Sequence, residues 1–197
     1  MTALWPARSA IRPIASYALV SADAVDAAES DVSDDGDLEA QVMGGFAALE
    51  MAQPALGRWL RAVVEPVRDE TAQALGYFLA IVVYGSFVSA FGQRVRRVDD
   101  ATLATVQATF EWDEELRRGD ADEVLESDDL VAIGQPHLMA FVREQVEAAL
   151  EPDEDGDPAD VDLDAVASVY RAVLMEILAL GQALTSPKGE RANDLLA

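Results

Sequence analysis

The feature that most constrains this fold is an uncharged stretch of 23 residues, Thr71 to Gln93, near the middle of a 197-residue chain. A helix of that length is long enough to cross a bilayer. Arginines flank both of its ends, so no one-sided excess of positive charge orients a membrane span. Glycine, serine and glutamine also dilute its hydrophobicity, at Gly76, Gly85, Ser86, Ser89, Gly92 and Gln93. We therefore expect a long apolar helix over about residues 66–95 at the centre of a soluble bundle. A single membrane span over 71–93 is the alternative.

Apolar residues in the rest of the chain recur at helical spacing. One stripe begins after Asp37, a second follows Pro54, a third follows Asp100, and a fourth follows Pro136. The segment from about 162 to 184 is charged in its body only at Arg171 and Glu176, which predicts a second, mostly buried, C-terminal helix. No segment alternates as a strand would. The sequence thus predicts an all-α compact bundle of about five to six helices.

The ends of the chain lack this periodicity. Residues 1–36 contain Pro6 and Pro13 and then a run of acids, and we expect them to form a mobile acidic N-terminal arm. Residues 37–184 are expected to form a single helical-bundle domain. Residues 185–197 are expected to be a flexible C-terminal tail.

The charge balance excludes several classes of function. The chain has 37 acidic residues against 14 basic ones, a net charge of −23, with no cysteine and one histidine. Thiol nucleophiles, thiolate metal sites and disulfides are therefore absent, and an autonomous nucleic-acid binder would need clustered cations. Two runs, 23–37 and 151–164, hold fifteen of the acids and no base, which leaves 22 acids against 14 bases and a net charge of −8 elsewhere. We expect these runs to be solvated loops, and acidity of this kind is also typical of adaptation to salt.

The second acidic run partly resembles a calcium-binding loop of the EF-hand type. Such loops place oxygen ligands at positions 1, 3, 5 and 12 and a glycine at position 6. Here Glu151, Asp153, Asp155 and Asp162 occupy the ligand positions and Gly156 the turn. Pro158 and the short Asp162 depart from the pattern, and an unstructured acidic linker is the alternative that we favour.

Two pairs of carboxylates resemble the metal-binding pairs of all-α, magnesium-dependent nucleotide pyrophosphohydrolases. Glu111 with Glu114, and Glu126 with Asp129, have the three-residue spacing that puts two acids on one helix face. The resemblance is limited to these four positions, and no lysine lies nearby to bind phosphate. We favour solvated surface acids, with a divalent-metal enzyme as the alternative.

Two further residues, His137 and Trp112, are of types that often serve in catalytic or partner-binding sites. His137 follows Pro136 at a predicted helix start and is expected to cap the helix or to be partly buried. Trp112 lies among Glu111, Asp113, Glu114 and Glu115, where its ring either borders the core or serves as an exposed anchor for a partner. Motifs for a serine nucleophile, a phosphate-binding glycine loop or a dinucleotide are absent.

We therefore expect a cytoplasmic, non-catalytic interaction or adaptor protein that binds a protein partner with a basic or apolar surface. No catalytic residue or resident cofactor is expected, and calcium or magnesium are the ions that the acidic clusters leave open. Direct binding to nucleic acid is not expected. A homo-oligomer is compatible with the sequence.

Overall fold

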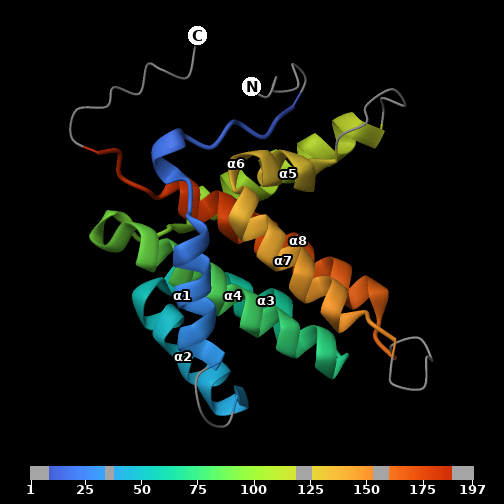
Figure 1. Cartoon of the computed structure of the whole chain (residues 1–197). Coiled ribbons are helices and arrows are strands. Elements are labelled where there is room, and N and C mark those ends of the chain that lie inside the picture. Colours follow the sequence, from blue (N-terminus) through green and yellow to red (C-terminus); the bar gives the residue numbers. More distant parts are fainter. Residues whose placement is uncertain (1–8, 34–37, 119–125, 153–159, 188–197) are drawn as a thin grey trace.

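The computed structural model describes residues 9–33, 38–118, 126–152 and 160–187 and folds them into a bundle of helices (Figure 1). Within these residues the all-α prediction is confirmed, and the helices number eight rather than five or six. Two short 3-10 turns, Ser16–Ala18 and Gly92–Arg94, and one antiparallel bridge between Val95 and Leu184 complete the described structure. The helices are α1 Ala22–Ser33, α2 Leu38–Ala52, α3 Pro54–Val64, α4 Glu70–Phe91, α5 Asp100–Arg118, α6 Ser127–Gly134, α7 Pro136–Ala149 and α8 Leu163–Gln182.

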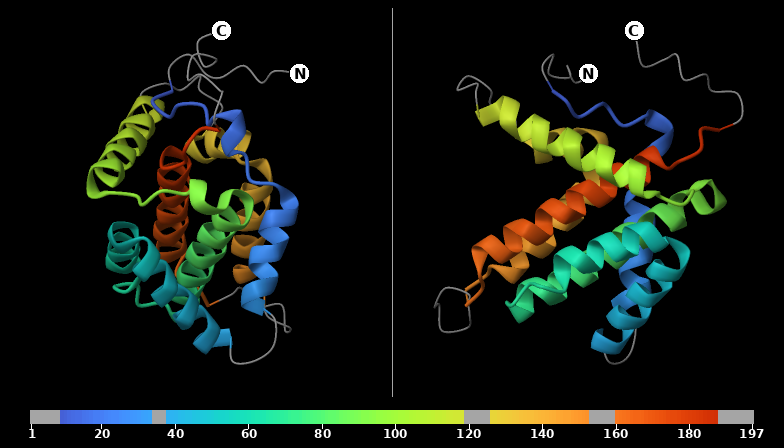
Figure 2. Two further views of the ribbon diagram at one scale, coloured as in Figure 1. Left: turned by 90° about the vertical axis from the view of Figure 1, so that its left-hand side faces the viewer. Right: turned by 180° about the vertical axis from the view of Figure 1, so that it is seen from behind.

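The uncharged stretch forms α4, which is the central helix of the bundle. Helices α1, α2, α3, α7 and α8 all pack against it, and the left view of Figure 2 shows it between α8 on one side and α1 on the other. The helix begins at Glu70 rather than near Pro66, because the Asp69 carboxylate accepts a hydrogen bond from the Ala72 N–H and caps the first turn. Among the described residues, α4 with its C-terminal turn is the one helix long and apolar enough to cross a membrane, and 56% of that window is buried inside the bundle.

Helix α8 runs parallel to α4, and hydrogen bonds join the two helices at both ends. At their starts, Asp69 Oδ2 accepts from the Asp162 N–H at 2.8 Å, and Asp162 in turn caps α8. At their ends, the Thr185 N–H donates to the Arg94 carbonyl at 3.0 Å. Gly76 allows close packing between them, because a Cβ there would lie 3.1 Å from a methyl group of Val169. The prediction of a mostly buried C-terminal helix is confirmed.

The N-terminal segment differs from the expected mobile arm. Residues 22–33 form α1, which packs along α4 and buries Ala24, Val25 and Ala28. Gly85 of α4 makes this approach possible, since a Cβ there would lie 3.2 Å from the Cβ of Ala28. The acids of α1 lie on its outer face, so part of the first acidic run belongs to an ordered helix and not to a loop. Residues 1–8 and 34–36 of the expected arm, and 188–197 of the expected tail, lie outside the described residues.

Candidate partner-binding surface

An uncharged, exposed stripe runs along the outer face of α5, which lies at the periphery of the bundle (Figure 2). Its members follow one another at spacings of three or four residues, so they share one face of the helix. Trp112 is 60% exposed and Leu116 is 38% exposed. The Thr105 hydroxyl donates to the Ala101 carbonyl at 2.8 Å, which satisfies this polar group within the helix. We call this set the α5 stripe: Ala101, Thr105, Ala108, Trp112 and Leu116.

The opposite face of α5 is fixed to the bundle by a buried carboxylate. Asp113 is 1% exposed and accepts hydrogen bonds from four donors that come from three parts of the chain. Burial raises the pKa of Asp113, but these hydrogen bonds outweigh that effect and lower its pKa below the ordinary value. The four hydrogen bonds to Asp113 join α5, α6 and the N-terminal segment, and therefore hold the α5 stripe on a rigid element. The donors are Arg117 Nε at 2.7 Å, Ser127 Oγ at 2.7 Å, Ser9 Oγ at 2.9 Å and the Ala10 N–H at 2.8 Å.

A second attachment ties α5 to α8. Arg171 donates two hydrogen bonds to the Glu114 carboxylate, at 2.9 and 2.8 Å, and its guanidinium carbon lies 5.4 Å from the centre of the Phe110 ring. A two-point pair of this kind fixes orientation better than a single contact does. These contacts fix the orientation of α5 about its own axis, so that the stripe faces solvent.

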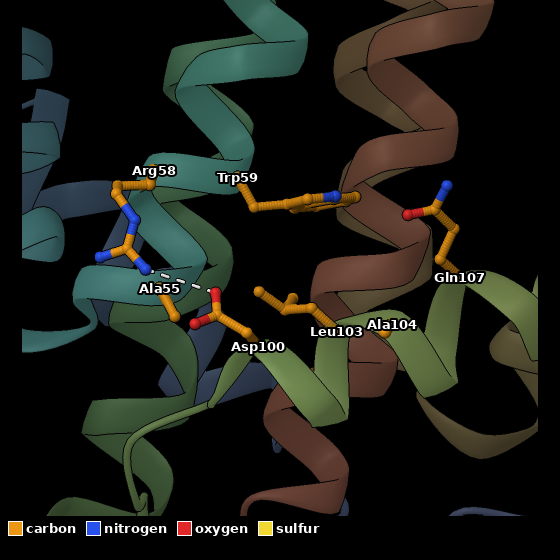
Figure 3. Close-up of a pocket in the computed structure, with 7 residues that line it drawn as sticks. All are labelled: Ala55, Arg58, Trp59, Asp100, Leu103, Ala104 and Gln107. Carbon is orange, nitrogen blue, oxygen red and sulfur yellow. Dashed lines mark hydrogen bonds and ion pairs between the residues drawn. The ribbon is translucent and has the colours of Figure 1, made fainter.

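A pocket of about 340 Å³ opens between α3 and α5 beside the N-terminal half of the stripe (Figure 3). The Trp59 ring extends across it from α3, and Leu103 projects into it from α5. Arg58 of α3 and Asp100 of α5 form an ion pair at 3.3 Å that bridges the two helices. The pocket combines apolar walls with a charged rim, a composition suited to a side chain or small ligand. Its lining residues are Ala55, Arg58, Trp59, Asp100, Leu103, Ala104 and Gln107.

The four carboxylates considered for magnesium are engaged in other contacts. Glu114 pairs with Arg171 as described, and Glu111 accepts a hydrogen bond from Gln107 at 3.0 Å. Glu126 and Asp129 form a capping box that begins α6, and Asp129 also pairs with Arg143 at 3.0 Å. Among the described residues, no group of three or more potential ligands is placed to hold a metal ion. The divalent-metal enzyme stays an untested prediction.

The calcium loop can be located only in part. Asp153 and Asp155 lie outside the described residues, and Glu151 is exposed after the end of α7. Asp162 Oδ1 accepts from the Asp164 and Ala165 N–H groups, at 2.9 and 3.3 Å, so it acts as the N-cap of α8. This local role explains Asp162 without a metal, and calcium binding stays an untested prediction.

His137 and Glu176 have environments that the sequence pattern did not indicate. His137 is exposed in the first turn of α7, whereas the sequence predicted a capping or partly buried residue. Glu176 is fully buried in α8, and neither of its carboxyl oxygens has a hydrogen-bond partner among the described residues. Burial raises its pKa well above the ordinary value and so favours the protonated form of the side chain.

Comparison of the chain with protein-family models, with curated proteins and with solved structures finds no match. The function therefore has to be inferred from the chemistry of the surface itself. Sequence reasoning identified Trp112 but missed Asp113, whose spacing of seven residues from Val106 and three from Phe110 places it on the buried face. It also missed the pocket, because α3 and α5 become neighbours only through tertiary packing.

Proposed function

We propose that this protein is a non-catalytic interaction protein whose α5 stripe binds an amphipathic helix of a partner protein, with basic residues beside the partner's apolar face. The observation that carries the proposal is Trp112, a large aromatic side chain 60% exposed on an uncharged helix face in a chain of net charge −23. Tryptophan is, with tyrosine and arginine, one of the residue types enriched among the residues that dominate the binding energy of protein interfaces. A partner helix laid along the stripe would remove this ring from water.

Charge complementarity supports a basic partner. Glu111 and Glu115 are exposed along one edge of the α5 stripe, and Asp100 is exposed at the start of the same helix. These acids would attract lysines and arginines at the edges of an apolar helix face, which favours rapid and oriented association. The uncharged stripe beside these acids offers apolar contact without the desolvation of a charged group.

The test uses a lysine-rich, leucine-containing amphipathic peptide labelled with a dye, whose binding is followed by fluorescence anisotropy. We expect Trp112→Ala to weaken binding about tenfold, the size typical of a buried aromatic anchor. Met51→Ala is the matched control, because Met51 is an apolar side chain 80% exposed on α2, away from the stripe. Circular dichroism would verify that both variants stay folded.

Salt provides a second and independent arm of the test. Raising the salt concentration from about 0.15 M to about 0.5 M roughly halves the screening length and should weaken binding if acidic side chains attract the peptide. Equal affinity of the Trp112→Ala and Met51→Ala variants, or binding indifferent to salt, would contradict the proposal.

A further inference from the structure

We propose that the pocket between α3 and α5 receives an apolar side chain of the same partner helix, while a basic residue of the partner replaces Arg58 on Asp100. This inference deepens the proposed function and rests on it. The pocket would then help to select the partner, which gives it a role beyond that of the α5 stripe. The occupant that we infer is an amphipathic helix with a lysine or arginine next to an aliphatic side chain.

The walls of the pocket are suited to an aliphatic group. Ala55, Ala104, Leu103 and the Trp59 ring supply apolar surface from two helices (Figure 3). The pocket is open to solvent, and its volume of about 340 Å³ exceeds that of a single leucine side chain. Burial of a side chain of this size contributes roughly a tenfold or larger gain in affinity.

The position of the pocket matches a helix lying on the α5 stripe. Ala104 lines the pocket and lies four residues, one helical turn, before Ala108 of the stripe, so the two residues are neighbours on the helix surface. Ala104 lies eight residues before Trp112, a separation of about 12 Å along a helix axis. A partner helix alongside α5 covers the same distance in about two turns. Two apolar side chains seven residues apart would therefore contact Trp112 and enter the pocket together.

The rim of the pocket favours a cation next to that apolar group. Arg58 and Asp100 pair at 3.3 Å, but their side chains are 65% and 83% exposed, so water competes strongly for both. An exposed pair of this kind contributes little to stability and is readily exchanged. A partner lysine or arginine entering the rim gains the Asp100 carboxylate and releases Arg58 to solvent. The surrounding acidic field favours this exchange.

The experiment compares two dye-labelled, lysine-rich helical peptides of equal composition. In the first peptide two leucines are seven residues apart, and in the second one leucine is moved by two positions so that the pair no longer shares a helix face. Affinities are measured by anisotropy for the full chain and four variants. Ala104→Trp fills the pocket, and its control Ala48→Trp adds the same ring at an exposed position on α2. Arg58→Ala frees the Asp100 carboxylate, and its control Arg68→Ala makes the same charge change outside the pocket.

We expect the spaced peptide to bind about tenfold more tightly than the shifted one, and Ala104→Trp to abolish that difference while Ala48→Trp preserves it. Arg58→Ala should strengthen binding about two- to threefold more than Arg68→Ala does.

If Trp112→Ala weakens binding but the two peptides bind equally and Ala104→Trp has no effect, the pocket inference fails and the proposed function stands. If neither peptide binds, both fail. A dimer in sedimentation that requires Trp112 would assign the surface to a second copy of the chain and overturn the inference.

Discussion

Replacing Glu176 with glutamine should stabilise the protein near neutral pH, by an amount that grows as the pH rises. The Glu176 carboxyl is 0% exposed and lacks a hydrogen-bond partner among the described residues, so ionisation in the folded state would leave a bare charge in the core. In the unfolded chain the same carboxyl titrates at an ordinary pKa of about 4.3. The folded protein therefore holds a proton that the unfolded chain has released.

The sign and the size of the effect follow from this difference of one proton. A folded-state pKa raised above the unfolded value gives stability that is fully present below the unfolded pKa and is lost as the pH rises toward the folded pKa. The loss is about 1.4 kcal/mol per pH unit, so about 2.7 kcal/mol between about pH 5 and pH 7 while the folded carboxyl keeps its proton. Glutamine has nearly the same shape and no proton to lose.

Among the described residues, no charge opposes the effect of burial on the Glu176 pKa. The helices that pack against α8 carry ionisable groups that have other partners: Arg61 of α3 pairs with Glu50, Glu114 of α5 with Arg171, and Asp128 of α6 with Arg143. On α4, Tyr84 has a pKa raised chiefly by burial and opposed by a hydrogen bond with Gln53. Burial is the one cause of the Glu176 shift.

Urea unfolding of the wild-type protein and Glu176→Gln, at about pH 5, 6 and 7, measures the gap in unfolding free energy. We expect a small gap at about pH 5 that widens by about 1.4 kcal/mol per unit. Glu147→Gln, at an exposed position of α7, makes the same charge change and should produce no such widening. A gap that stays constant with pH, or a glutamine variant less stable than wild type at pH 7, would show that Glu176 does not hold a proton that the unfolded chain releases.

Three further predictions concern the structural contacts. Asp113→Asn should lower the free energy of unfolding by about 2–3 kcal/mol, because it weakens the buried hydrogen bonds that Asp113 accepts. Since the pKa of Asp113 is lowered in the folded protein, its contribution is present above the unfolded pKa and is lost on acidification. The difference in unfolding free energy between wild type and variant, measured in urea, should therefore shrink at low pH. Gly44→Ala should raise the melting temperature, as a Cβ there meets nothing within 4 Å, whereas Gly76→Ala should lower it, since a Cβ would lie 3.0 Å from Val64. Asp162→Ala should cost about 1 kcal/mol as a lost helix cap; stabilisation of the wild type by calcium that disappears in this variant would instead favour the calcium loop.

The sequence predicted the large helices because their apolar residues have strong periodicity and clear boundaries. Pro54 and Pro136 open α3 and α7, and the uncharged stretch identifies the centre of the bundle. Helix α1 was missed because its buried face consists mainly of alanine and valine and its outer face of acids. That composition resembles a polar linker, and only the space provided by Gly85 of α4 turns it into a packing surface.

The candidate site was predictable only as a single residue. Trp112 stood out as an aromatic side chain among acids, but its neighbours on the stripe are alanines and a threonine, which carry little hydrophobic signal. The pocket depends on how α3 and α5 approach each other, and no local pattern encodes that approach. Glu176 was visible as a charge in an apolar helix, but its complete burial results from the helices that surround α8.

The pairing of α4 with α8 has a consequence for how the chain is made. About 70 residues separate the end of one helix from the start of its partner. At about 5–20 residues per second, a ribosome needs roughly 4 to 14 seconds to synthesise that interval. During this time the most apolar helix of the protein lacks its partner and is open to chaperones, to aggregation or to the machinery that recognises membrane segments. The newly made protein therefore depends on what protects α4 in those seconds.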